Sequence, residues 1–336
     1  MKLYKIMFLN SMVFGTLISI SSYSWMSMWM GLEINLLSII PLLSDNKNVF
    51  SSESSLKYFI TQAMASMILL MAVITLLLTD EFINPLVNFY SMMMMNTALL
   101  TKVGAAPFHF WLPEVIEGLS WMNSLIMLTW QKIAPMMLLM NNKINTQFLI
   151  SIIVISLIMS TISGFNQISL RKILAFSSIN HIAWMLSTLM ISLSLWTTYF
   201  LVYSMINISM ISMFKMTKSF YINQINNIMN QNKLVKFTFM TNFLSLGGLP
   251  PFIGFLPKWL VINWMTENNL MLITFIMIIT TLIMLFIYIR VMMSSMLLFI
   301  NEPKITKINI NNEKLILINM ITLTSMVFCT MILNLY

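Results

Sequence analysis

Eleven apolar runs, each long enough to cross a membrane, follow one another along this chain with short polar segments between them. An α-helix needs about 20 apolar residues to span the roughly 30 Å of hydrocarbon in a bilayer. Only 8% of the residues are charged, against about 25% in a soluble domain, so a water-soluble globular protein is excluded. We therefore predict an all-α polytopic membrane protein that forms one domain over residues 1–336. The runs cover residues 5–22, 25–43, 57–79, 85–107, 121–140, 147–164, 170–191, 196–216, 236–265, 270–293 and 315–336.

The basic residues predict the orientation of these spans, because retained loops carry the excess of Lys and Arg. Of the 18 Lys and Arg residues, Lys102, Lys132 and Lys258 lie in the interior of spans, Lys143 falls on the far side, and the other 14 lie in loops or near span ends on the side of the N-terminus. We expect the N-terminus inside and, after eleven crossings, the C-terminus outside. No small-residue cleavage site follows the first run, so we expect this run to be retained. The net charge of +8 is not clustered on one face, which argues against a nucleic-acid partner.

Four ionisable side chains lie inside the apolar runs: Glu33, Lys102, Lys132 and Lys258. A charge at the bilayer centre costs about 2.5 to 3.5 kcal/mol on insertion scales, so such residues indicate ion or proton pathways. One carboxylate and three amines suit a proton relay, whereas a metal site needs several His, Cys or carboxylate ligands. Burial favours a neutral lysine and a nearby carboxylate favours a charged one, so a Glu–Lys pair can load and release a proton. The alternative is that Glu33 and Lys102 only neutralise each other in a packed bundle.

Proline and glycine interrupt two of the runs, near residues 85–113 and 236–265. PFHFWLP (107–113) and PFIGFLP (251–257) carry Pro, Phe, Leu and Pro at equal spacing. The two interrupted runs are five apart and so cross the membrane in opposite directions, and matched broken helices are a sequence indicator of a transport site. We predict an inverted repeat with two discontinuous helices, an antiporter-like arrangement. A chance match in a chain rich in Phe and Leu is the alternative.

The two histidines lie near these features, His109 beside the first break and His181 inside the run 170–191. A buried imidazole can relay protons or can simply satisfy its hydrogen bonds in a packed core. Both interpretations stand for His109, and the structural one is favoured for His181. Glu114 and Glu117 follow the first break, where we expect them to be solvated.

Motifs for redox cofactors and nucleotides are absent from the sequence. It contains no GxGxxG, Walker motif, CxxC, histidine pair for haem or nucleophile elbow. The single cysteine, Cys329, excludes a disulfide scaffold. We therefore expect no cofactor or metal on this chain and no redox chemistry by this chain alone.

Five motifs cover much of the chain: MGLEINLLS (30–38), SLKYF (55–59), KVGAAPFHFWLPEVIEGLSWMNSLIMLTWQKIAP (102–135), LRKILAFSSINHIAWML (170–186) and FLSLGGLPPFIGFLPKW (243–259). Together they resemble the subunit 2 family of mitochondrial NADH dehydrogenase, antiporter-like membrane subunits of respiratory complex I, in a form similar to that of insects. By motif position the resemblance implies that Glu33 is the carboxylate beside the broken helix and Lys102 its paired lysine. It also implies that Lys132 is the central relay lysine and Lys258 the lysine of the second broken helix, near the outward exit.

The resemblance implies a core subunit that translocates protons across the mitochondrial inner membrane, coupled to quinone reduction in other subunits. NADH, FMN, iron–sulfur clusters and ubiquinone would then lie on partner chains. Expected partners are neighbouring antiporter-like and small membrane subunits, accessory subunits and lipid, cardiolipin included. The N-terminus would face the matrix and the C-terminus the intermembrane space. Two alternatives stay open: an Mrp-type cation/proton antiporter subunit and a purely structural membrane subunit.

Overall fold

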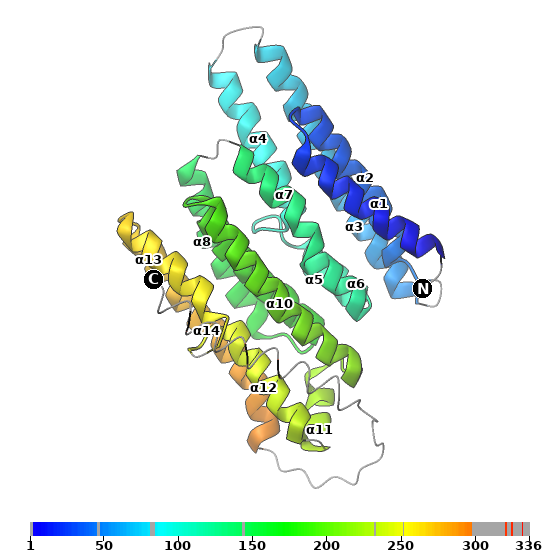
Figure 1. The fold of residues 1–336 in the computed structure, drawn as a ribbon, viewed down its shortest axis with the longest axis vertical. Helices are drawn as coiled ribbons and strands as arrows, with labels where there is room; N and C mark the ends of the chain where they lie inside the picture. Colours follow the sequence, from blue (N-terminus) through cyan, green and yellow to red (C-terminus); the bar gives the residue numbers. More distant parts are fainter. Residues whose placement is uncertain are drawn as a thin grey trace. The chain divides into compact units, whose positions relative to one another are not determined.

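The computed structural model describes residues 3–45, 48–80, 85–142, 145–231, 233–250 and 252–297, with Met320, Thr324 and Met331. Regular structure in these residues is helical, apart from one isolated antiparallel bridge between Ser169 and Tyr221. The chain divides into two compact units, Met1–Ile152 and Ile153–Tyr336 (Figure 1). The all-helical prediction is confirmed, and the prediction of a single domain over residues 1–336 stays a prediction.

Unit 1 is a bundle of long helices with short, interrupted ones packed among them (Figure 1). Helix α2 packs on α1 and α3, α3 packs on α4 and α5, and α7 packs on α1, α4 and α6. A buried apolar cluster that includes Met12, Ile39, Tyr58, Val115 and Met127 joins five of these helices. The helices are α1 (Leu3–Ser21), α2 (Trp25–Leu43), α3 (Val49–Asp80), α4 (Pro85–Val103), α5 (Trp111–Gly118), α6 (Trp121–Leu128) and α7 (Trp130–Asn141).

The crossing of α1 and α2 is built on two glycines. A Cβ atom on Gly31 would lie 2.6 Å from the backbone nitrogen of Ser19 and 2.9 Å from the carbonyl oxygen of Gly15. A Cβ atom on Gly15 would lie 2.8 Å from the backbone nitrogen of Asn35. Small residues let membrane helices approach backbone to backbone, which compensates for the weak hydrophobic drive between helices in lipid. This contact fixes α2, the helix that carries Glu33.

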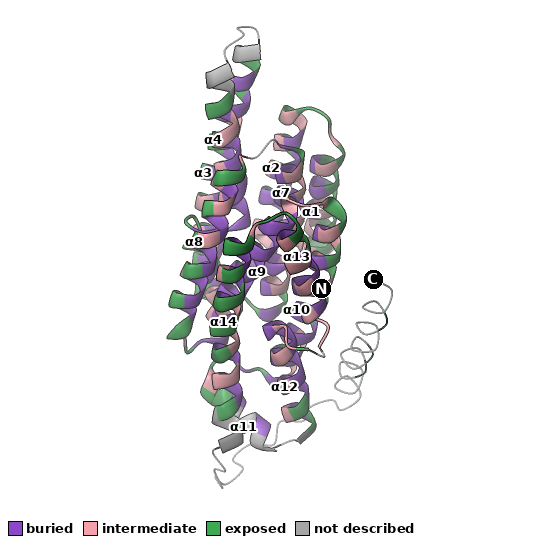
Figure 2. Ribbon diagram, turned by 90° about the vertical axis from the view of Figure 1, so that its left-hand side faces the viewer, coloured by how far each residue is buried: buried purple, intermediate pink, exposed green. Residues whose placement is uncertain are grey.

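Unit 2 contains α9 to α14 and most of α8. Helix α10 packs on α9, α12 and α13, and α14 packs on α9, α11, α12 and α13. Every residue of α9 from Ile173 to Thr188 is buried, whereas α14 exposes apolar side chains along one side, among them Leu272, Phe275 and Ile279 (Figure 2). An exposed apolar stripe at helical spacing is typical of a lipid-facing helix. The helices are α8 (Thr146–Phe165), α9 (Leu170–Leu189), α10 (Leu193–Thr217), α11 (Ile222–Gln231), α12 (Lys233–Gly247), α13 (Phe255–Glu267) and α14 (Met271–Leu297).

The first ten predicted spans each coincide with one described helix or with two consecutive ones, and the eleventh, 315–336, lies outside the described residues. Three expectations need correction. Helix α3 begins at Val49 and not at residue 57, the run 121–140 is interrupted, and a helix, α11, lies between the predicted spans 196–216 and 236–265. Within the described residues, six helices contain segments that are long and apolar enough to span a membrane by themselves: Leu3–Ser21, Trp25–Leu43, Val49–Leu78, Thr146–Phe165, Leu193–Thr217 and Met271–Met293.

Candidate functional site

The first predicted break lies between α4 and α5. Gly104 has a φ of 83°, and its N–H donates to the carbonyl of Leu100 at 3.0 Å, as does the N–H of Ala105 at 3.1 Å. A glycine in the left-handed region after the last helical turn is a common way to end a helix. The chain then turns, with the N–H of Phe108 donating to the carbonyl of Ala105, and resumes a helix at Trp111.

The second break, between α12 and α13, repeats this pattern 144 residues later. Gly248 has a φ of 75°, and its N–H and that of Leu249 both donate to the carbonyl of Leu244, at 3.1 and 3.3 Å. The N–H of Phe252 donates to the carbonyl of Leu249, as Phe108 does to Ala105. The two discontinuous helices predicted from the sequence are therefore confirmed. Pro251, the first residue of the second motif, lies outside the described residues.

Lys102 lies in the last turn of α4, where 7% of the residue is exposed. Glu33 lies in the middle of α2, and no direct ion pair joins it to Lys102 among the described residues. The Oε1 atom of Glu33 is enclosed and has no hydrogen-bond partner in the part of the chain that the structure describes. The pairing of Glu33 with Lys102 and its role in proton loading stay predictions.

Lys132 lies in the first turn of α7 and is 1% exposed. The predicted continuous helix 121–140 is wrong here, because α6 ends and α7 begins around Thr129. Pro135 has no N–H to donate to the carbonyl of Gln131, four residues earlier, and its ring crowds that turn. At the interruption itself, the hydroxyl of Thr129 donates to the carbonyl of Leu125 at 2.8 Å. Lys132 therefore follows a third helix interruption, which the apolar run did not reveal.

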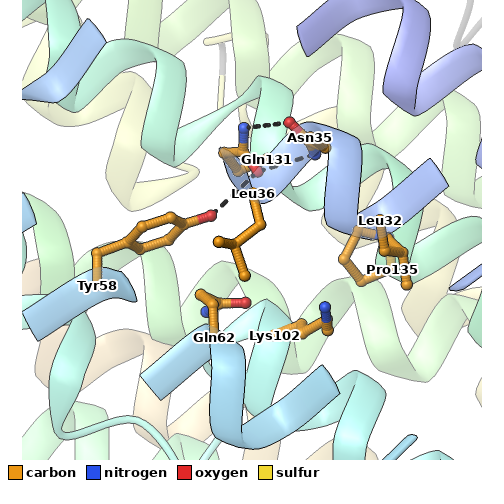
Figure 3. Close-up of a pocket in the computed structure, with 8 residues that line it drawn as sticks. All are labelled: Leu32, Asn35, Leu36, Tyr58, Gln62, Lys102, Gln131 and Pro135. Carbon is orange, nitrogen blue, oxygen red and sulfur yellow. Dashed lines mark hydrogen bonds between the residues drawn. The ribbon is translucent and has the colours of Figure 1, made fainter. Parts of the chain in front are cut away.

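A small cavity opens beside Lys102 (Figure 3). Its volume is about 10 Å³, close to the minimum that holds one water molecule. The side chains of Asn35, Tyr58 and Gln131 form a hydrogen-bonded group on one side, while Gln62 and Lys102 lie on another. The lining residues are Leu32, Asn35, Leu36, Tyr58, Gln62, Lys102, Gln131 and Pro135.

Lys258 lies against the second break in unit 2. Its Nζ donates to the carbonyl of Gly247 at 3.0 Å, and the residue is 8% exposed. A Cβ atom on Gly248 would lie 2.9 Å from the same Nζ, so a larger residue here would displace the lysine side chain. The ammonium also lies 5.8 Å from the ring centroid of Trp184 on α9, a cation–π distance.

The two histidines differ in their surroundings. His109 is buried between α4 and α5, and its ring lies 4.5 Å from that of Phe110. His181, on α9, shares a 2.9 Å hydrogen bond between its Nδ1 and the hydroxyl of Tyr199, and its ring lies 5.1 Å from that of Tyr203. This hydrogen bond fits the structural interpretation of His181, and a relay role for either histidine stays a prediction.

Glu114 is exposed, as expected, and it also takes part in an ion pair. Lys57 on α3 pairs with Glu114 on α5 at 3.1 Å and with Glu53 one turn away at 3.0 Å. Under the 144-residue offset, Glu114 occupies the position in α5 that Lys258 occupies in α13. The equivalent places after the two breaks therefore carry opposite charges.

Glu33, Lys102, Lys132 and His109 belong to unit 1, and Lys258 and His181 belong to unit 2. The polar side chains around Lys102 and the indole beside Lys258 were not predicted from the sequence. The amides around Lys102 could have been found from the sequence, because an amide inside an apolar run is costly unless it is hydrogen-bonded. The residues missed are Asn35, Tyr58, Gln62, Gln131 and Trp184.

Comparison of the sequence with protein families and curated proteins gives consistent matches. A family described as NADH:quinone oxidoreductase/Mrp antiporter, transmembrane, matches residues 22–284. The chain is 50% identical over 330 residues to NADH-ubiquinone oxidoreductase chain 2 of Anopheles gambiae, covering 97% of this chain and 96% of the relative. It is 39% identical over 298 residues to the protein of that name from Oryctolagus cuniculus, covering 87% and 85%.

Two solved structures show the same fold at low sequence identity. A chain of respiratory complex I from Thermus thermophilus with bound aureothin has a TM-score of 0.86 and 19% identity, covering 98% of this chain and 78% of that one. A chain of the Mrp complex from Dietzia sp. has a TM-score of 0.78 and 15% identity, covering 90% and 62%. The predicted antiporter-like fold is therefore confirmed.

Proposed function

Because this chain belongs to the NADH:quinone oxidoreductase/Mrp antiporter transmembrane family, we propose that it is a proton-translocating core membrane subunit of mitochondrial respiratory complex I. The identity to an insect NADH-ubiquinone oxidoreductase chain 2, over nearly the full length of both chains, supports the assignment to this complex. The NADH, FMN, iron–sulfur and ubiquinone sites of the complex would lie on partner chains, which include the neighbouring antiporter-like, small membrane and accessory subunits.

The observation that carries the proposal is the burial of three lysines at helix interruptions. Lys102 precedes the first break, Lys132 follows the interruption at Thr129, and Lys258 lies over the second break. Interrupted membrane helices leave backbone groups that need protein or water partners, so water can reach such places. In the proposed relay, quinone reduction elsewhere drives protons stepwise between these lysines, and Glu33 favours or releases the charged form of Lys102 as its own charge changes.

The test compares proton pumping in wild type and the Lys132→Met variant of the assembled complex in sealed inner-membrane vesicles. We expect a lower proton-to-electron ratio, with NADH oxidation retained, because methionine keeps the packing volume but cannot carry a proton. Lys215→Met is the matched control, since it removes an exposed lysine at the end of α10 by the same substitution. An unchanged ratio in Lys132→Met would contradict the relay and favour a purely structural subunit.

We further propose that the N-terminus faces the matrix and the C-terminus the intermembrane space. The distribution of Lys and Arg along the sequence supports this orientation. An N-terminal protease-sensitive tag should be cleaved only after the inner membrane is opened. Cleavage in intact mitoplasts, whose outer membrane alone is broken, would contradict the orientation.

The Mrp-type antiporter alternative is supported by the likeness to the Dietzia structure, which concerns the fold alone. It makes a separate prediction, since an antiporter exchanges cations for protons without electron transfer. Sodium-dependent proton movement in vesicles that contain this chain without the rest of complex I would favour the alternative.

A further inference from the structure

Asn35 on α2 and Gln131 on α7 form a reciprocal amide pair within unit 1. The Nδ2 of Asn35 donates to the Oε1 of Gln131 at 3.1 Å, and the Nε2 of Gln131 donates to the Oδ1 of Asn35 at 2.9 Å. Both residues are buried, and a buried amide that loses its partner pays the full cost of desolvation. The pair therefore favours one relative position of the two helices over others.

A third residue fixes the orientation of the glutamine amide. The hydroxyl of Tyr58 on α3 lies 3.3 Å from the Oε1 of Gln131 and donates to it (Figure 3). Because this oxygen already accepts from Asn35, the amide cannot be turned over without losing hydrogen bonds on both sides. Gln131 is thus held by side chains from two helices at once.

Gln131 lies in the first turn of α7, where the helix backbone lacks some of the hydrogen bonds that hold later turns. Gln131 is one residue before Lys132 and two after Thr129, where the helix is interrupted. Its carbonyl has no N–H donor four residues later, because that residue is Pro135. Side-chain contacts from α2 and α3 therefore supply a constraint on the first turn of α7 that the helix backbone lacks.

The same group closes the cavity beside Lys102. The Nε2 atom of Gln62, a residue that is 4% exposed, has no hydrogen-bond partner among the described residues. A water in this cavity of about 10 Å³ could accept from Gln62 and from Lys102, which meets the minimum of two polar partners. Movement of Gln131 would open one wall of this space.

We propose that Asn35 and Gln131 are positioning residues for Lys132, because their amide pair holds the first turn of α7 against α2 and retains one water beside Lys102. Neither residue takes up a proton in this scheme. The proposal rests on the proposed function, since it assigns these residues a task in the relay that includes Lys132.

The experiment uses the assembled complex with Gln131→Met, Asn35→Leu and the exchanged pair Asn35→Gln with Gln131→Asn. The single variants keep approximate volume but remove the reciprocal hydrogen bonds, and the exchanged pair keeps two amides of the same total size. Loss of one interhelical hydrogen bond in a membrane lowers the population of the arrangement that it stabilises about threefold. We therefore expect roughly tenfold slower coupled turnover when both bonds are lost. The exchanged pair should recover most of that loss.

Two further readouts separate positioning from simple loss of structure. We expect Gln131→Met to change the shape of the pH profile of coupled NADH oxidation. A loss of folded complex would instead lower the rate by the same factor at every pH. A high-resolution structure of the wild-type complex should show a water between Lys102 and Gln62, and that of Gln131→Met should lack it. If the single variants do not assemble, Tyr58→Phe removes one hydroxyl with little change in packing and should slow turnover about threefold.

The outcomes distinguish this inference from the proposed function. A lowered proton ratio in Lys132→Met, together with wild-type turnover and pH profile in Gln131→Met, would retain the relay and overturn the positioning role. Wild-type behaviour in Tyr58→Phe, where the single variants fail to assemble, would also overturn it. An unchanged ratio in Lys132→Met would instead overturn the proposed function itself.

Discussion

Replacement of Gly31 by alanine tests the packing of α1 against α2. The added carbon would lie 2.6 Å from the nitrogen of Ser19, and its other near neighbours, at 2.9 Å, are also backbone atoms. Ordinary contact begins at 3.4 Å, so the helices must separate by about 0.8 Å at this point. Overpacking of this kind costs about 1 to 3 kcal/mol, offset by about 0.5 to 1 kcal/mol from the better helix propensity of alanine. We expect a net loss of up to about 2.5 kcal/mol.

The assay is the amount of assembled complex on native gels and its midpoint of heat inactivation. Gly164→Ala, in α8, is the matched control, because a Cβ atom there would meet its nearest neighbour, the Cβ of Phe176, at 3.4 Å. That variant should be as stable as wild type or more stable by about 0.5 to 1 kcal/mol. Equal heat resistance of Gly31→Ala and Gly164→Ala would refute the argument from the close crossing.

Two other substitutions test local features. Gly248→Ala adds a Cβ at a φ of 75°, which costs about 1 to 2 kcal/mol, and displaces Lys258. We expect a lower proton ratio than in Gly104→Ala, where the same backbone strain meets the side chains of Trp111 and Leu112 and no lysine. Equal ratios would refute a specific effect on the lysine. Lys57→Met breaks two ion pairs at an exposed site. We expect a small drop in the heat-inactivation temperature at low salt and no drop at high salt, because salt screens exposed ion pairs. A drop that persists at high salt would contradict an electrostatic origin.

The sequence predicts helix ends best where the signal is local. Helix α2 begins at Trp25, as predicted, after Ser24, whose side chain accepts from the N–H of Ser27 at 3.3 Å. Helix α3 begins earlier than predicted because the serines of the segment 49–56 bond to carbonyls of their own helix, Ser52 to Val49 among them. A polar composition that suggests a loop is thereby accommodated in a helix.

The three helix interruptions differ in whether the sequence marks them at the break itself. The breaks at Gly104 and Gly248 were predictable because the glycine and the nearby prolines stand at the break itself. The interruption at Thr129 was not, because the apolar run continues through it without a glycine or proline at the break. Pro135, the proline of this span, removes the hydrogen bond to the carbonyl of Gln131 and not one at Thr129.

The candidate site was predictable residue by residue but not as an arrangement. Glu33 and the three lysines stand out because each is a costly charge in an apolar context. Their neighbours depend on tertiary packing: Asn35 and Gln131 are 96 residues apart, and Trp184 reaches Lys258 from another helix. Spacing in the sequence contains no information on such pairs until the helices are packed.

The Asn35–Gln131 pair has a consequence for a membrane that carries a voltage. A charge that crosses the full potential changes energy by about 2.3 kcal/mol per 100 mV, so ion pairs inside the membrane respond to the energised state. Two amides joined by reciprocal hydrogen bonds carry no net charge. The first turn of α7 is therefore held with nearly the same strength in a resting and in a fully energised membrane.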